Sequence, residues 1–147
     1  MQKVFVTTDF STNSKAAVRF AIQFAKETSS EIIFYNIFEG VADNSWDPKK
    51  KLSSHKEERL MKLNKFVETI YKESGIKPGI FKCMVDIGID TKNLILNSAK
   101  KNKVNFICIS SRGGGILKKL LGSTTSSLIE LSTIPVIVVP KNYRIKK

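Results

Sequence analysis

The sequence is poor in the residues that build metal sites and histidine-based catalytic triads. It has one histidine and two cysteines among 147 residues. A structural zinc site needs four Cys or His ligands and a triad needs a histidine beside its nucleophile, so neither is expected. His55 stands among charged residues in a helical pattern and is predicted to be an exposed bystander. Cys83 and Cys108 fall within strand-like segments, which predicts buried free thiols rather than a disulfide.

Long hydrophobic runs are also missing. The longest apolar stretches, such as Ile134 to Pro140, are far shorter than the ~20 residues that cross a bilayer. Met1 is followed by a polar-flanked strand pattern rather than by the charged and apolar regions of a secretory signal. We therefore predict a cytoplasmic protein that does not associate with membranes.

Acidic residues are scarce relative to basic ones. The chain has 13 Asp and Glu against 25 Lys and Arg, a formal net charge of +12. Such a charge attracts nucleic acids, anionic lipids and phosphorylated ligands without specifying which. The positive side chains are mostly lysine, have few aromatics among them, and come with no zinc-knuckle or RNA-recognition signature. We interpret them as a solvated basic surface, with residues 141–147 as a short basic tail, and do not expect a nucleic-acid partner.

Hydrophobic periodicity switches repeatedly between strand and helix patterns along the chain. Apolar and β-branched runs predict five strands, at 3–8, 31–38, 80–85, 104–110 and 135–139. Apolar residues at helical spacing predict four helices, the first around 17–25 and the others at 52–73, 92–101 and 123–132. Residues 39–50 form the longest irregular stretch, and Asp86-Ile87-Gly88 is predicted to be a turn.

Strands that alternate with helices predict a parallel sheet, because each right-handed crossover must pack back onto the sheet. We predict an α/β fold in which residues 1–147 form a single doubly wound domain. Its five-stranded parallel sheet has the strand order 3-2-1-4-5 and carries helices on both faces. In such a sheet, ligands bind beyond the carboxyl ends of the strands, where the strand order reverses.

Two chemical features fall at those strand ends. Asp9 directly follows the first strand, and a segment from Ser110 to Gly115 leads from the fourth strand towards a helix that starts at Gly122. Three consecutive glycines let the backbone approach a ligand closely, and the free N–H groups of a helix start favour an anion. An aspartate across the cleft could accept hydrogen bonds from ribose hydroxyls. Positive charge near the helix start comes from three side chains: Arg112, Lys118 and Lys119.

Simpler interpretations of both features stay open. A glycine-rich loop followed by Ser and Thr can be ordinary loop and cap chemistry, and Asp9 alone can cap the following helix. The P-loop pattern is absent, and the first strand–helix turn, Asp9-Phe10-Ser11, lacks the glycines of a dinucleotide-binding fingerprint. The residues alone leave an anion site and a plain loop as alternatives.

Several segments nevertheless resemble one known family. The run Val6 to Ser11 (VTTDFS) is similar to the opening strand and turn of the universal stress proteins, and Asp86-Ile87-Gly88 is similar to the glycine turn before their third helix. Ser110 to Val139 resembles their C-terminal block of strand, glycine loop, Gly-Ser, short helix and Pro-Val-Ile-Val-Val. The resemblance covers essentially the whole chain, which is identified as a member on this basis.

The ATP-binding members of that family carry Gly, two residues, Gly, nine residues, then Gly-Ser or Gly-Thr. Here Ser110 stands in place of the first glycine, Gly113 matches the second, and Gly122-Ser123 follows after eight residues rather than nine. The resemblance implies that Asp9 contacts the adenosine portion and that Ile37 lies beside the base. It implies an adenine nucleotide (ATP, ADP or AMP), with Mg²⁺ as the accompanying cation, bound by Thr7, Thr8, Asp9, Ile37, Ile109, Ser110, Arg112, Gly113, Gly122, Ser123, Thr124 and Thr125.

The function that the resemblance implies is nucleotide binding in the stress response, by a homodimer that pairs through its last strand. No catalytic base is evident, so very slow ATP hydrolysis is the most that is expected. One alternative is an ATP-independent stress or interaction protein that acts through its dimer surface or through the segment Glu39 to Lys51, with Trp46 as the exposed anchor. Another is nucleic-acid binding, which predicts a steep salt dependence and basic residues gathered on one face.

Overall fold

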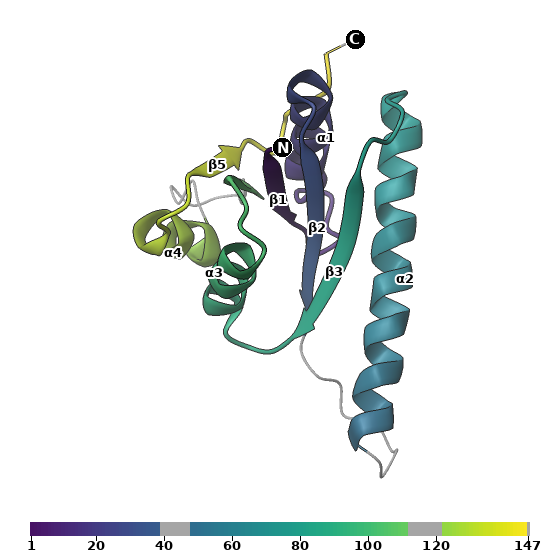
Figure 1. The fold of residues 1–147 in the computed structure, drawn as a ribbon, viewed down its shortest axis with the longest axis vertical. Coiled ribbons are helices and arrows are strands. Elements are labelled where there is room, and N and C mark those ends of the chain that lie inside the picture. The colour runs from purple at the N-terminus through teal and green to yellow at the C-terminus, as the bar shows by residue number, and fades with distance from the viewer. Residues whose placement is uncertain (39–47, 112–121, 147) are drawn as a thin grey trace.

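The computed structural model describes residues 1–38, 48–111 and 122–146, with side chains from all of these except 48–54 (Figure 1). Strands and helices alternate along these segments. In chain order they are β1 (Lys3–Thr7), α1 (Lys15–Thr28), β2 (Glu31–Phe38), α2 (Pro48–Ser74), β3 (Phe81–Ile87), α3 (Thr91–Lys101), β4 (Phe106–Ser110), α4 (Ser123–Leu131) and β5 (Val136–Val139).

The five strands form one parallel sheet in the order β3-β2-β1-β4-β5, which confirms the predicted fold. Chain order runs outward from β1 to β3 on one side and from β4 to β5 on the other, so the strand order reverses between β1 and β4. The central strand β1 pairs with both neighbours, and Val4, Phe5 and Val6 are fully buried. Its apolar side chains point both ways because helices cover both faces of the sheet.

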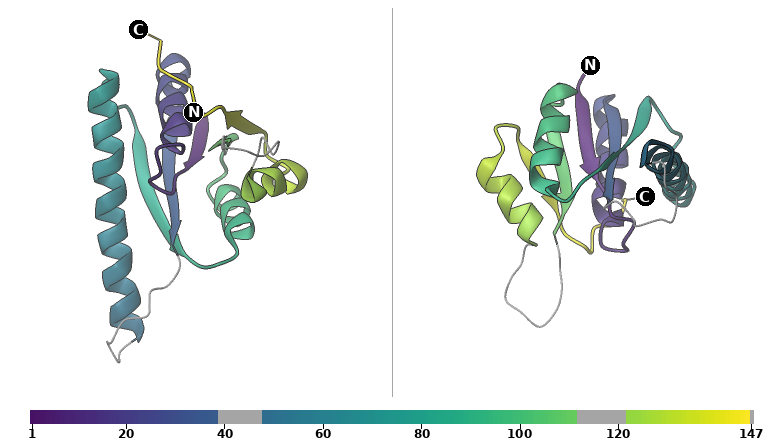
Figure 2. Two further views of the ribbon diagram at one scale, coloured as in Figure 1. Left: turned by 180° about the vertical axis from the view of Figure 1, so that it is seen from behind. Right: turned by 90° about the horizontal axis from the view of Figure 1, so that it is seen from below.

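Each face of the sheet packs against one pair of helices (Figure 2). On one face, alternate strand residues such as Val4 and Phe34 pack with Ala21 of α1 and Leu63 of α2. On the other face, the remaining strand residues pack against α3 and α4 in a second cluster that includes Phe5, Ile33, Tyr35, Ile95, Ala99, Ile107 and Leu128. The right-handed crossovers therefore put two helices on each side, as in other doubly wound sheets.

The long helix α2 lies along β3 and extends past the end of the sheet (Figure 1). Leu63, Val67 and Ile70 form its buried stripe, with exposed fractions of 0%, 0% and 1%. The helix ends before Gly75, whose φ of 71° is the left-handed conformation that terminates helices and favours glycine. No helix in the described part of the chain is both long and apolar enough to span a bilayer.

Two sequence predictions about the elements were wrong in detail. Asp86 and Ile87 continue β3 instead of forming a turn, because they pair with Ile37 and Phe38 of β2. Residues 48–50 are helical rather than irregular, with a proline at the first position of α2, where its missing N–H costs nothing. Trp46 and the rest of the segment 39–47 lie outside the described residues.

Neither cysteine has the lowered pKa of a reactive thiol. Both thiols are free, with Cys108 buried and Cys83 half-buried. Burial raises the pKa of Cys83 and of Cys108 to about 12, so both remain protonated at neutral pH and are poor nucleophiles. His55 is half-buried rather than exposed, with Nδ1 4.0 Å from a carboxylate oxygen of Glu58 one turn away.

Candidate functional site

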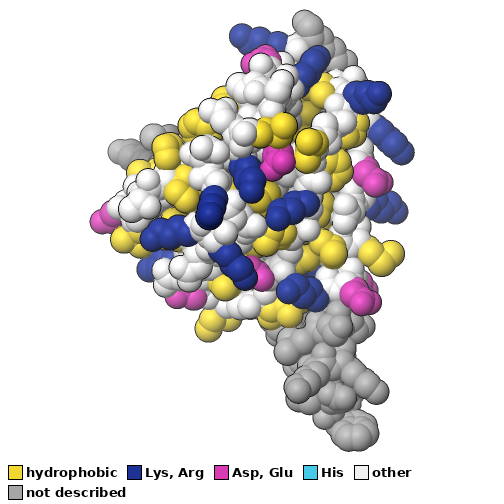
Figure 3. All heavy atoms as spheres, viewed as in Figure 1, with side chains coloured by type: hydrophobic (Ala, Val, Ile, Leu, Met, Phe, Trp, Pro, Cys, Tyr) yellow, Lys and Arg dark blue, Asp and Glu magenta, His cyan; other side chains and the backbone are white. Residues whose placement is uncertain are grey.

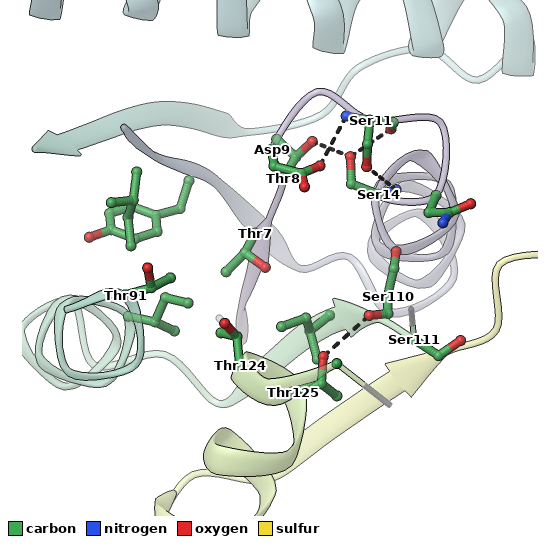
Figure 4. Close-up of a pocket in the computed structure, with 16 residues that line it drawn as sticks. Thr7, Thr8, Asp9, Ser11, Ser14, Thr91, Ser110, Ser111, Thr124 and Thr125 are labelled. Atoms are coloured by element: carbon green, nitrogen blue, oxygen red, sulfur yellow. Dashed lines mark hydrogen bonds between the residues drawn. The ribbon is translucent and has the colours of Figure 1, made fainter. Parts of the chain in front are cut away.

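A cavity of about 580 Å³ opens beyond the carboxyl ends of β1 and β4, where the strand order reverses (Figure 4). Most of the predicted site residues line it: Thr7, Thr8, Asp9, Ile37, Ile109, Ser110, Gly122, Thr124 and Thr125. Ser123 is exposed and is not part of the lining. Arg112 and Gly113 lie outside the described residues. The cavity thus gathers residues from the ends of several strands and helices that are far apart in the sequence.

The turn after β1 is fixed by a small network of hydroxyl groups. The Thr8 and Ser14 side-chain oxygens lie 2.7 Å apart, and the Phe10 amide donates to the Thr8 hydroxyl over 3.1 Å. The Ser11 amide donates to a carboxylate oxygen of Asp9 over 2.9 Å. Asp9 therefore closes its own turn rather than capping α1, whose N-cap residue is Ser14.

Phe10 holds this turn in a strained conformation. Its φ of 69° lies in the left-handed region, which costs a non-glycine residue about 1–3 kcal/mol. The Phe10 ring packs edge-on against Phe66 of α2 with centroids 5.4 Å apart, and the Lys62 ammonium lies 4.5 Å from the ring centre. These contacts offset the strain and hold the Asp9 turn against the body of the protein.

The Asp9 carboxyl is the one carboxyl group among the described lining residues. Partial burial by itself would raise its pKa, but hydrogen bonds from the Ser11 hydroxyl and amide and from the Ser14 hydroxyl outweigh this effect. The pKa of Asp9 is therefore held below its usual value. At neutral pH the group is an ionised acceptor that lines the cavity.

The side chain of Ser110, at the end of β4, caps the start of helix α1, although the two are 93 residues apart in the sequence. Its hydroxyl oxygen accepts a hydrogen bond from the buried Ala17 amide over 3.0 Å. That amide lies in the first turn of α1, where backbone donors have no partner inside the helix, and the N-cap Ser14 makes no side-chain capping bond. The residue that stands in place of the family's first glycine thus has a structural task of its own.

The N-terminus of α4 borders the opposite side of the cavity. The first helical bond runs from the Ser126 amide to the Gly122 carbonyl, so the amides before Ser126 have no partner within the helix. The Thr125 hydroxyl donates to the Ser110 carbonyl over 3.4 Å and ties this end of α4 to β4. Figure 4 shows Thr124 and Thr125 facing the cavity across from Thr8 and Asp9.

Sequence reasoning missed a second group of lining residues: Ser11, Asn13, Ser14, Tyr35, Thr91, Ile95 and Ser111. Sequence spacing could have indicated some of these residues. Tyr35 lies two residues before Ile37, so both point to the same face of their strand, and Ile95 lies four residues after Thr91, so both lie on the same face of their helix. Tyr35 and Ile95 are buried and form an apolar wall with Ile37 and Ile109. The Tyr35 hydroxyl donates to Asp86 over 2.6 Å, which fixes the ring.

The described lining contains no histidine, cysteine, lysine or arginine. Nor does any group of three or more His, Cys, Asp and Glu residues in the described segments have the arrangement of a metal site. The described lining offers one carboxylate, many hydroxyls, the first amides of α4, which have no partner within that helix, and one apolar wall. Such an arrangement suits the binding of a polar ligand that has an apolar face.

Together, the sheet order and this cavity define a doubly wound α/β protein with a polar cavity at the point where its strand order reverses. A sequence model of the universal stress protein family matches residues 1–140, and the chain belongs to that family. The universal stress protein MJ0531 of Methanocaldococcus jannaschii is 32% identical over 148 residues, covering 95% of this chain and 82% of that protein.

Two solved structures show the same fold with nucleotides bound. A universal stress protein in complex with cAMP has a TM-score of 0.65 and 20% identity, covering 96% of this chain and 98% of its own. The universal stress protein of Archaeoglobus fulgidus in complex with dAMP has a TM-score of 0.61 and 16% identity, covering 95% and 98%. At these identities, the likeness establishes a shared fold.

Replacing Ser110 by alanine tests the hydrogen bond by which its hydroxyl caps α1. The Ser110→Ala variant leaves the buried Ala17 amide without its acceptor, so we expect it to lose about 1–3 kcal/mol of unfolding free energy. Ser111→Ala is the matched control, since its amide bond to the Val139 carbonyl survives the substitution. Urea unfolding followed by circular dichroism at fixed protein concentration measures both, and equal effects would contradict the cap.

The pKa of Asp9 can be measured by NMR titration of its side-chain carboxyl carbon. We expect a value below the usual 3.8 in the wild type and a rise in Ser11→Ala, which removes the hydroxyl donor. Because the folded-state pKa is depressed, the stabilisation is present above the unfolded-state pKa and is lost as the pH falls through the folded-state value. The exposed neighbour variant Thr12→Ala should leave the pKa unchanged; an unshifted Ser11→Ala would refute the assignment.

Proposed function

We propose that this protein binds an adenine nucleotide in the cavity at the carboxyl ends of β1 and β4 and acts in the stress response. The observation that carries the proposal is the cavity itself. It has about 580 Å³ at the switch point, with an apolar wall on the β2 and α3 side and a helix N-terminus on the α4 side. A base and a phosphate group need these two environments at opposite ends of one site.

The nucleoside would occupy the side between β1, β2 and α3. Ile37 and Ile95 offer apolar surface for the base, and the ionised Asp9 carboxylate offers an acceptor for ribose hydroxyls. The strained turn around Phe10 fixes the position of Asp9 before any ligand arrives. This preorganisation reduces the conformational entropy that binding would otherwise cost.

The phosphates would lie against the start of α4. Its first amides, which have no partner within the helix, and the hydroxyls of Thr124 and Thr125 are donors that suit phosphate oxygens. The described lining carries no cation, so compensating charge for a triphosphate must come from Mg²⁺ or from basic residues of the loop that lies outside the described residues: Arg112, Lys118 and Lys119. The two fold relatives solved with cAMP and dAMP support an adenine nucleotide as the ligand class.

The same features argue for a sensor rather than an enzyme. Asp9 already accepts hydrogen bonds from Ser11, and the other ionisable group of the described lining, the Tyr35 phenol, donates to Asp86. Hydrolysis would therefore be very slow at most. We place this role in the cytoplasm, where adenine nucleotides are available and two free thiols persist.

Nucleic-acid binding is the competing use of the +12 charge. On the face shown in Figure 3, Lys and Arg side chains are spread among acidic, apolar and neutral polar side chains rather than gathered into one basic stripe. A dispersed charge of this kind favours weak, salt-sensitive association with any polyanion. The cavity, in contrast, predicts a saturable site for one small ligand.

Calorimetric titration with ATP, with and without Mg²⁺, tests the nucleotide proposal. We expect saturable binding of one ATP per chain and loss of at least tenfold in affinity for Gly122→Val. The φ of Gly122 is −69°, which valine tolerates, so the variant narrows the cavity without forcing the backbone. Gly79→Val is the control, because a Cβ there meets nothing within 4 Å at the far end of the sheet.

The opposite outcome is equally clear. No heat and no thermal stabilisation at millimolar ATP would overturn nucleotide binding, because a ligand at 100 times its Kd stabilises the folded state by about 2.7 kcal/mol. The protein would then be an ATP-independent member of the family. Weak binding that disappears between low and moderate salt would instead indicate non-specific attraction to the basic surface.

We also propose that the protein is a homodimer that pairs through β5. This strand forms one edge of the sheet and consists of four apolar residues, Val136–Val139, without a charged gatekeeper. The Pro135 and Val139 carbonyls accept hydrogen bonds from Ile107 and Ser111, so the backbone groups of Val136 and Val138 point away from β4, where the described residues include no further strand. The exposed side chains of Ile129 and Leu131 on neighbouring α4 add apolar surface.

Replacing Val138 by proline tests the proposed dimer contact through β5. Val138→Pro removes an edge-facing N–H while leaving the pairing of β5 with β4, and proline is tolerated on edge strands. We expect sedimentation velocity to show a dimer for the wild type and for Val138→Ala, and a monomer for Val138→Pro with native circular dichroism. A wild type that sediments as a monomer at all concentrations would contradict the proposal.

A further inference from the structure

A second cavity lies at the opposite end of the sheet from the first. It has a volume of about 310 Å³ and lies where the C-terminal ends of α1 and α2 meet the start of β2, in the upper part of Figure 1. Its walls are mainly apolar, with Ile22 and Ala25 from α1, Ile32 from β2, and Ile76 and Ile80 from the connection between α2 and β3. This volume is at the lower end of the ~300–1,000 Å³ typical of small-molecule sites.

One polar group in this cavity has no partner in the described protein. Tyr71, in the last turn of α2, lines the cavity with an exposed fraction of 5%. Its ring packs against Phe34 and Phe81 with centroids 6.2 and 5.5 Å away. No described residue hydrogen-bonds to its hydroxyl, and the hydroxyl oxygen is not fully enclosed by protein atoms, so it is open to a ligand in the cavity. Burial raises the pKa of Tyr71 to about 12, so the hydroxyl is a neutral donor that is available to a group inside the cavity.

The charges at this cavity are of one sign. Lys26 and Lys77 belong to its lining, and no acidic residue does. Neither ammonium takes part in an ion pair within the described segments. The C-termini of α1 and α2 bring partial charges of about −0.5 each, against two full positive charges, which leaves a net of about +1. An anion is therefore favoured over a cation at the rim of an otherwise apolar space.

We propose that this second cavity binds a small amphipathic carboxylate, such as a medium-chain fatty acid anion. The alkyl chain would occupy the apolar space between α1 and β2. The carboxylate would accept a hydrogen bond from the Tyr71 hydroxyl and lie near the Lys77 ammonium, so one ligand would engage both the hydroxyl donor and the cation. The site shares no lining residue with the cavity at β1 and β4, and binding there does not depend on a nucleotide.

Titration with octanoate, followed by amide NMR and calorimetry, tests this site. We expect saturable one-to-one binding, with the largest shifts at amides 25–30 and 76–80 and none at 7–9 or 122–125. The uncharged probe 1-octanol and the cationic probe octylamine should bind at least tenfold more weakly. Tyr71→Phe and Lys77→Gln should each weaken octanoate binding by about tenfold, the loss of one charge-assisted hydrogen bond. Lys65→Gln, an exposed lysine elsewhere on α2, should change nothing.

Three results would overturn the proposal: absence of saturable octanoate binding, equal binding of octylamine, or shifts confined to residues that line the other cavity. Because Lys77 is exposed, Lys77→Gln keeps the test valid even if Tyr71→Phe is found unfolded by circular dichroism. Each variant is also titrated with ATP. If a variant binds octanoate more weakly but gives the same ATP titration as the wild type, the effect lies in the second cavity. This conclusion holds whether or not the wild type binds ATP.

Discussion

The pairing of β1 with a parallel strand on each side is the constraint on which the rest of the structure depends. Once β1 is central and its side chains are buried on both faces, the chain must cross over to opposite faces to add β2 and β4. The helices α1 and α3 that make these first crossings separate at the carboxyl ends of β1 and β4. Polar residues of the turn after β1 and of the segment that begins after β4 line the gap between them.

Ser110 shows how a departure from the family's motif can be accommodated. A glycine at this position would leave the Ala17 amide at the start of α1 without an acceptor, whereas the serine hydroxyl provides one. The side chain is therefore turned towards α1, and the Ser110 carbonyl accepts a hydrogen bond from the Thr125 hydroxyl at the start of α4. One residue at the end of β4 thus links the N-termini of two helices that border the same cavity. The serine side chain adds the link to α1, whereas the link to Thr125 uses the backbone carbonyl that any residue supplies.

The hydrophobic pattern of the sequence was sufficient to predict the limits of a strand that is buried on both faces. The limits of Glu31–Phe38 follow directly from its apolar run, because this strand has a neighbour on each edge and helices on each face. The same pattern wrongly predicted a turn at Asp86. The strand conformation of this residue depends on pairing with Ile37 and on the hydrogen bond from the Tyr35 hydroxyl, and both partners are distant in sequence. The missed part of the cavity has the same cause: Thr91 on α3 joins the site only through tertiary packing.

The two ends of the sheet differ in electrostatic character because every strand is parallel. All helices run antiparallel to the strands, so helix N-termini collect at the carboxyl ends and helix C-termini at the amino ends. Backbone amides of α4 favour an anion at the first cavity without any side-chain cation in the described lining. At the second cavity the helix ends oppose an anion, and Lys26 and Lys77 reverse the sign. Backbone dipoles thus favour an anion at one end of the sheet, whereas at the other end anion preference depends on two side chains that substitution can remove.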